Sequence, residues 1–229
     1  MKLHGMTLSS LCIVLFAIMS LTTQAYAEQE WSGLANGDII FQDRSGPRSE
    51  ILKRASGTSI THVGIVRPTG GGFYVAHVMP EHGMFEEPIE SFIEKGRGGR
   101  YWISRYDGLP YPPDENHPAV ASAYASHYLA EYDTFHMPGN EALYDAEFIN
   151  VVYGENGVDL GEPATLKSLG VRSESDLTTL FGEWEAHPVC QSRKLSAQDC
   201  RAELMDFEIL TPASIAEDEE LELVYTNAR

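Results

Sequence analysis

The stretch ITHVGIVRPTGGGFYVAHVMP, residues 60–80, decides the fold. β-Branched and aromatic residues lie on both sides of three glycines, and this pattern predicts a β-hairpin. His62 and His77 interrupt the two apolar runs. We therefore expect both imidazoles on neighbouring strands, and on one face of the hairpin if the register allows it. Taken singly, each histidine is more typical of a hydrogen-bonded core residue than of a ligand.

Further strands and helices are predicted around this hairpin. NGDIIFQD (36–43) has the pattern of a buried strand, and RYWISRY (100–106) predicts another. Helices are predicted at residues 49–57, 118–131 and 142–154, and a short helix with a closing strand at 209–226. Strands followed by helices and a final strand indicate an α+β domain rather than a doubly wound sheet.

The first 27 residues have the features of a signal peptide. A short basic start precedes the apolar run LSSLCIVLFAIMSL, and AYA at 25–27 is a small-x-small cleavage pattern. The apolar run is too short for a good membrane span, and Cys12 within it does not resemble a lipid-attachment site. We expect a periplasmic or secreted protein that begins near Glu28 and has no membrane span; a retained N-terminal anchor is the alternative.

The composition is strongly acidic. The formal net charge is −18, and the predicted leader contains Lys2 but no acidic residue, which leaves 15 basic residues against 34 acidic ones. Such a surface repels polyanions, so nucleic acids and anionic membrane faces are not expected partners. Solubility or a salty medium is the simplest explanation of the acidity.

Residues 28–229 have a length that suits one domain. A helical insertion is predicted at about residues 164–206, and it contains Cys190 and Cys200. Two cysteines ten residues apart in an exported chain predict a disulfide. Closing this loop would contribute roughly 3 kcal/mol or somewhat less.

Asp145 is an acidic residue near the start of the helix predicted in ALYDAEFINVVYG (142–154). Aspartate is among the preferred helix N-cap residues, contributing about 1 kcal/mol over alanine, and its charge suits the helix dipole. Asp145 could therefore be a cap, part of a reactive site, or the remnant of one.

The order of these motifs resembles that of the YiiX/YebB-like hydrolases, which are circularly permuted papain-fold relatives of the NlpC cell-wall peptidases. The matching segments are NGDIIFQ, THVGIV, FYVAHV, YD at 132–133 and LYDAEFINVVY. The resemblance runs from about residue 36 to 160 and resumes at ILTPASIAED, so it leaves out the cysteine-bearing insertion. It implies a circularly permuted papain-like (NlpC-type) α+β domain, with a small antiparallel sheet packed on helices.

The family's mechanism is thiol-based and needs no cofactor. A cysteine at a helix N-terminus is activated by the helix dipole and by a histidine on a facing strand, and a third polar residue orients the ring. By resemblance, His62 is the base, His77 is the orienting residue, and Asp145 stands at the nucleophile position. The family's motif there reads YCSE, and this chain reads YDAE.

Three hypotheses follow from this departure. In the first, the chain is a pseudoenzyme in which Asp145 caps the helix, pairs with His62, and leaves a binding role. In the second, it remains a hydrolase in which Asp145 acts as general base for water. In the third, His62, His77 and Asp145 bind zinc or ferrous iron, since two imidazoles and a carboxylate are a known ligand set.

Four other residues are weaker candidates. The resemblance suggests that Asp38 shapes the cleft entrance, although a turn role also suits it. Tyr144 could line the pocket or support an oxyanion site, or simply pack. Glu147 is expected to be a surface acid near the helix start, and His82 a solvated loop histidine with a possible place in the cleft.

By resemblance, the substrates or ligands would be cell-wall peptides, lipids or other acyl compounds that contain amide or ester bonds. An exported location agrees with the cell envelope.

Overall fold

A computed structural model of the chain describes residues 31, 33–113 and 115–228. The predicted leader, residues 1–27, lies outside the described residues. The chain divides into two units, Met1–Leu34 and Ala35–Arg229. The second unit contains the strands and helices described below.

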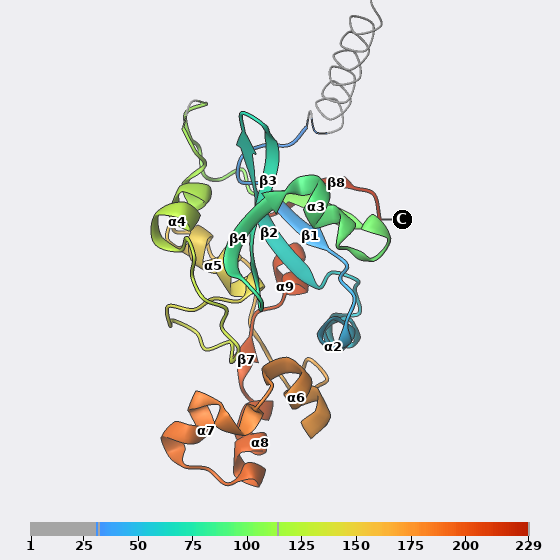
Figure 1. The fold of residues 1–229 in the computed structure, drawn as a ribbon, viewed down its shortest axis with the longest axis vertical. Helices are drawn as coiled ribbons and strands as arrows, with labels where there is room; N and C mark the ends of the chain where they lie inside the picture. The colour runs from blue at the N-terminus through green and yellow to red at the C-terminus, as the bar shows by residue number, and fades with distance from the viewer. Residues whose placement is uncertain (1–30, 32, 114, 229) are drawn as a thin grey trace, which may run out of the picture. The chain divides into compact units, whose positions relative to one another are not determined.

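A six-stranded antiparallel sheet forms the centre of this unit, with the order β4-β3-β2-β1-β5-β8 (Figure 1). Its strands are β1 (Ile39–Gln42), β2 (His62–Thr69), β3 (Gly72–Met79), β4 (Gly83–Pro88), β5 (Tyr101–Arg105) and β8 (Glu222–Thr226). A separate two-stranded pair joins β6 (Ala164–Thr165) to β7 (Glu208–Ile209). The predicted hairpin and the strands on either side of it are confirmed.

The hairpin register places His62 and His77 on one face of the sheet. Strands β2 and β3 pair from Thr69 opposite Gly72 to Gly64 opposite His77. His62 lies two residues before Gly64 on β2, so its side chain is on the same face as His77 and diagonal to it. On its other side, His62 pairs with Gln42 of β1.

The helices lie around the sheet and in the segment between β6 and β7. They are α2 (Pro47–Ser56), α3 (Ile89–Glu94), η1 (Arg97–Gly99), α4 (Pro118–Ser126), α5 (Asp145–Gly154), α6 (Glu174–Phe181), η2 (Trp184–Ala186), α7 (Pro188–Arg193), α8 (Ala197–Met205) and α9 (Pro212–Ala216). The predicted extension of α4 to residue 131 is wrong. The chain turns after His127, and Leu129 has a φ of 65°, outside the right-handed helical region.

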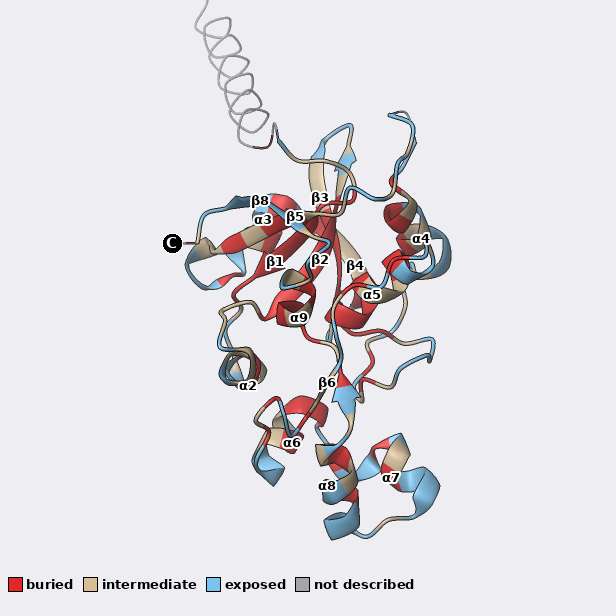
Figure 2. Ribbon diagram, turned by 180° about the vertical axis from the view of Figure 1, so that it is seen from behind, coloured by how far each residue is buried: buried red, intermediate tan, exposed pale blue. Residues whose placement is uncertain are grey.

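The main core lies between the sheet and the helices α4 and α5. Apolar side chains of β1, β2 and β3 pack there against Val120 of α4 and Phe148, Ile149 and Val152 of α5, all buried. Figure 2 shows this burial along β1, β2 and α5. Because α5 packs directly on β2 and β3, the start of this helix lies close to the strands that carry the two histidines.

A second core occupies the helical segment predicted as an insertion. Leu166, Leu177, Phe181 and Leu204 are fully buried in it. Cys190 and Cys200 form a disulfide, as predicted from their spacing. The helices α6, α7 and α8 gather beyond β7, away from the six-stranded sheet (Figure 1).

The predicted closing strand is present as β8, and it is exposed along its whole length. Leu223 and Tyr225 are 56% and 48% exposed, because β8 is the edge of the sheet. None of the helices within the described residues is long and apolar enough to cross a membrane.

Candidate active site

Asp145 and His62 meet at the start of α5. His62 Nδ1 lies 2.7 Å from Asp145 Oδ2, and both residues are buried. Asp145 is the first helical residue, while Tyr144 occupies the N-cap position without a side-chain hydrogen bond. The Ala146 N–H donates to Asp145 Oδ1 at 3.0 Å. The carboxylate is therefore placed beside the helix N-terminus as expected, but the prediction of an N-cap at Asp145 is wrong.

The hydrogen bonds continue from His62 through His77 to Glu87. His62 Nε2 lies 2.8 Å from His77 Nδ1, and His77 Nε2 lies 3.0 Å from Glu87 Oε1. The other carboxylate oxygen of Glu87 accepts from Ser91 Oγ and Lys95 Nζ, both at 2.5 Å. Asp145, His62, His77 and Glu87 thus form a hydrogen-bonded series, which we call the relay. Strands β2, β3 and β4 and helix α5 each contribute one residue.

The relay contains a proton imbalance. Its three contacts need three protons, and two neutral imidazoles carry only two. A neutral His77 can donate to His62 or to Glu87, but not to both. A protonated His77 can donate to both at once. The ionised Glu87 therefore competes with His62 for the proton of His77.

Burial governs the titration of both rings. Desolvation lowers the pKa of His62, and the hydrogen bond and charge of Asp145 only partly oppose this. Burial likewise lowers the pKa of His77 to about 4, against the opposing effect of its hydrogen bond to Glu87. At neutral pH both rings are therefore neutral, and they compete for the hydrogen bonds available.

Both carboxyl groups are held ionised. Burial alone would raise the pKa of Asp145, but the hydrogen bond from His62 and the charges of His62 and Arg48 outweigh it and lower the pKa. Burial would also raise the pKa of Glu87, but hydrogen bonds from His77, Lys95 and Ser91 lower it to about 2. Asp145 is therefore a weak base.

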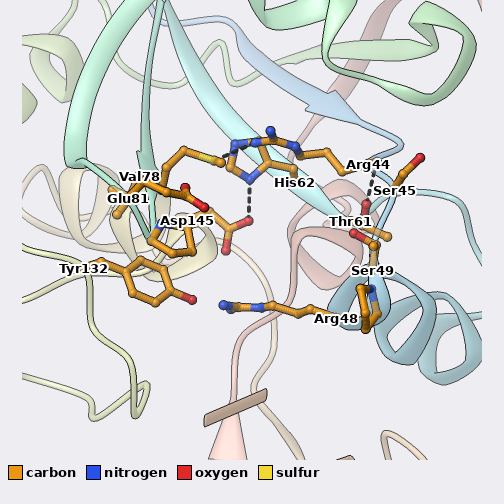
Figure 3. A pocket seen from close by; sticks show the side chains of 14 residues that line it. Arg44, Ser45, Arg48, Ser49, Thr61, His62, Val78, Glu81, Tyr132 and Asp145 are labelled. Carbon is orange, nitrogen blue, oxygen red and sulfur yellow. Dashed lines mark hydrogen bonds and ion pairs between the residues drawn. The ribbon is translucent and has the colours of Figure 1, made fainter. Parts of the chain in front are cut away.

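A cavity of about 310 Å³ opens beside Asp145 and His62. The loop after β1 and the first turn of α2 form one wall, with Arg44, Arg48 and Ser49, and Tyr132 lies opposite (Figure 3). His77 is fully buried behind His62 and does not line the cavity. A ligand in the cavity would therefore contact Asp145 and His62 directly, and His77 would act only through His62.

The geometry does not suit the predicted metal alternative. His62 uses both ring nitrogens in hydrogen bonds, and so does His77, so the donors lie in series rather than around a common point. Within the described residues, no group of three or more His, Cys, Asp or Glu side chains is arranged to hold a metal ion. The ligand set His62, His77 and Asp145 is therefore not supported.

The weaker candidates take structural positions. Asp38 accepts from Arg105 Nε at 2.6 Å and from the Ala35 N–H at 2.7 Å, outside the cavity lining. The Tyr144 hydroxyl accepts from the Leu210 N–H at 3.0 Å, which favours packing over an oxyanion role. His82 is exposed, as expected.

The expectation that Glu147 is a surface acid is wrong. It is buried rather than on the surface, and burial together with the nearby charge of Asp133 raises its pKa to about 7.

Sequence reasoning missed Glu87, Arg44 and Arg48. Glu87 follows Glu86 in β4, and the pair has the appearance of two surface acids. Glu86 pairs with Arg67, whereas Glu87 faces His77. The alternation of a strand would have marked one of the two acids as inward-facing, but not which one.

The fold and the relay define a permuted papain-like domain, with a histidine on a strand facing the first residue of a buried helix. Residues 33–225 match the family described as permuted papain-like amidase enzyme, YaeF/YiiX, C92 family. The chain belongs to this family, which confirms the resemblance and the α+β fold drawn from the sequence.

A solved structure is similar to this chain. It is the crystal structure titled "metalloprotein yiiX" from Escherichia coli O157:H7, with a TM-score of 0.67 and 20% identity. The match covers 85% of this chain and 98% of that one, and at this identity it shows the fold alone. The comparison with curated proteins returned no match.

Proposed function

We propose that this chain is a ligand-binding member of the permuted papain-like amidase family in which the cleft persists and the thiol chemistry is lost. The observation that supports this most directly is Asp145 at the head of α5, 2.7 Å from His62 and on the wall of the cavity. By resemblance this is the position of the cysteine nucleophile. A side chain there would be the first protein group to meet a bound acyl carbon.

Carboxylate chemistry is poorly suited to the family reaction. A carboxylate is a far weaker nucleophile than a thiolate toward an amide, and the product of its attack would be a mixed anhydride. The low pKa of Asp145 also makes it a poor general base for water. Both His62 nitrogens are hydrogen-bonded, as in an active triad, so the argument for binding rests on the carboxylate at residue 145.

The second candidate is a hydrolase in which Asp145 activates a water molecule. It is favoured by one feature, namely that Asp145 lines a cavity large enough for a small ligand and water. For either function, we propose cell-wall peptides, lipids or related acyl compounds as ligands and an exported location. The family description names an amidase, which supports an acyl ligand with an amide bond, and the predicted leader supports the exported location.

Acylation of residue 145 by p-nitrophenyl octanoate tests the proposed function. The native chain should release no nitrophenol above the background rate and gain no mass. Asp145→Cys should gain one octanoyl group at residue 145 by peptide mass spectrometry, and Asp145→Cys with His62→Ala should lose most of that reactivity. Asp145→Asn serves as the matched control without a thiol. Turnover by the native chain that is abolished by His62→Ala would establish the hydrolase instead.

A further inference from the structure

Two arginines line the cavity near the relay. Arg44 follows β1, and Arg48 lies in the first turn of α2. In Figure 3 the Arg48 guanidinium extends into the space between Tyr132 and Asp145, and Arg44 runs along the His62 side. Both cations therefore flank the place where a ligand would meet Asp145.

Neither guanidinium has a carboxylate partner. Within the described residues, no Asp or Glu oxygen lies within 4.0 Å of Arg44 or Arg48. Arg44 Nη1 contacts the thioether of Met79 at 2.5 Å, and Arg48 Nη2 donates to His136 Nε2 at 2.7 Å. Burial, and then the charge of Arg48, lower the pKa of His136 well below its usual value, so this partner is neutral.

Most arginines of the described residues pair with a carboxylate; besides Arg44 and Arg48, only exposed Arg172 and half-buried Arg201 do not. Six other arginines pair with carboxylates, and these are Arg54, Arg67, Arg97, Arg100, Arg105 and Arg193. With 34 acidic residues in the sequence, carboxylates are plentiful. The charges of carboxylates farther than 4.0 Å away, Asp145 above all, act on both guanidinium groups, but none among the described residues contacts them. Partly buried cations without a carboxylate in contact are costly, so we expect an anionic group of a ligand to fill this position.

Ser49 and the start of α2 add donors to the same wall. Ser49 is 8% exposed and lines the cavity, and its hydroxyl has no hydrogen-bond partner among the described residues. Helix α2 begins after Gly46, which provides no side-chain cap. Its first residue, Pro47, has no N–H, so only the N–H groups of Arg48 and Ser49 and the positive dipole end remain available for an anion.

We propose that Arg44 and Arg48, with Ser49, form a subsite for an anionic group of the ligand, a carboxylate or a phosphate. The inference rests on the proposed function, since it assumes that the acyl part of the same ligand lies at Asp145 and His62. Guanidinium groups bind the oxygens of both anions in a bidentate manner, and a helix start adds further donors. Glu81 also lines the cavity at an exposed position, and its charge partly offsets that of Arg44.

Two alkylating reagents of nearly equal size but different charge test the subsite on the full chain. Iodoacetate carries a carboxylate and iodoacetamide does not. In Asp145→Cys, the rate ratio of iodoacetate to iodoacetamide at residue 145 should exceed the ratio for free cysteine by about tenfold or more, because hydrogen bonds to charged groups are strong. Arg44→Gln and Arg48→Gln should each reduce this ratio toward that of free cysteine.

Two control variants separate charge from folding. Arg48→Lys keeps the charge and should retain part of the preference for iodoacetate. Arg54→Gln makes the same charge change on α2 at a residue that pairs with Asp176, and should leave the ratio unchanged. Suppose that His62 activates the thiol of Asp145→Cys, but that its ratio of iodoacetate to iodoacetamide rates equals that of free cysteine. This result would overturn the subsite and leave the proposed function standing.

Titration of the native chain needs no substitution. N-octanoylglycine and N-octanoyl-phosphoethanolamine provide a carboxylate and a phosphate, and N-octanoylglycinamide is the neutral match. By calorimetry, at least one anionic ligand should bind about tenfold more tightly than the amide. This difference in affinity should shrink as the salt concentration is raised. The anionic ligand that binds more tightly identifies the preferred anion. Equal binding of all three would overturn the subsite, and so would tighter binding of the amide.

Discussion

Replacing Glu87 by glutamine tests how much the ionised Glu87, the end of the relay that does not line the cavity, contributes to the free energy of unfolding. Glutamine resembles the protonated acid in shape, so the substitution removes the charge and little volume. The pKa of Glu87 is lowered from 4.5 to about 2, and each unit of difference corresponds to about 1.4 kcal/mol. The full shift would correspond to about 3 kcal/mol. Lys95 is 43% exposed, so water screens part of its interaction with Glu87. We therefore expect Glu87→Gln to lower the free energy of unfolding by about 2 kcal/mol at neutral pH.

The pH dependence distinguishes this electrostatic origin from a packing defect. A carboxyl group with a lowered folded-state pKa stabilises the fold above its unfolded pKa, and this stabilisation is lost as pH falls through the folded pKa. Urea denaturation should therefore give a native-minus-variant difference that is full at pH 7 and shrinks between pH 5 and about 2. Glu94→Gln, at an exposed position on α3, is the control. A difference that is the same at pH 7 and pH 3 would refute the reasoning.

Three further perturbations test the fold around the site. Tyr153→Phe removes a hydroxyl that donates to the Gly37 carbonyl at 2.6 Å, and urea denaturation should show a loss of about 1 kcal/mol. Gly37→Ala should cost more than about 2 kcal/mol in the same assay, because φ is +92° and a Cβ there would lie 2.4 Å from the His117 ring. Reduction of the Cys190–Cys200 disulfide should cost about 3 kcal/mol or somewhat less, measured as a lower melting temperature in dithiothreitol.

The hairpin and its histidines could be predicted because their signals are local. Alternation, β-branching and a glycine-rich turn fix the strands, and two polar residues within apolar runs indicate a special position. Asp145 could be placed near the start of a helix for the same reason. These features needed only neighbouring residues in the sequence.

The remaining site residues depend on tertiary packing. Glu87 faces His77 only because β4 pairs with β3 in the register that sets Phe85 opposite His77. Glu147 was expected on the surface as a first-turn acid, yet packing buries it and brings Asp133 close. The sequence does not encode which of several acidic residues will face inward, because burial is decided by segments far apart in the chain.

The arginines of the cavity have no local signature either. Arg44 and Arg48 lie in RSGPRSE, which has the composition of an ordinary turn and helix start. The fold brings them beside Asp145 in one cavity, although they lie about 100 positions away from it in the sequence. Their missing carboxylate partners become visible only once every ion pair in the described chain is known.

The pH dependence of iodoacetamide labelling at residue 145 in Asp145→Cys is the most direct test of the central claim, that this residue stands in a site built for a thiol. If it does, the helix start and His62 should lower the thiol pKa below its usual 8.5. Labelling at pH 6 should then be much faster than in a Glu94→Cys surface control, and His62→Ala should remove the advantage. An inflection near 8.5, with labelling no faster than in the surface control, would contradict the account.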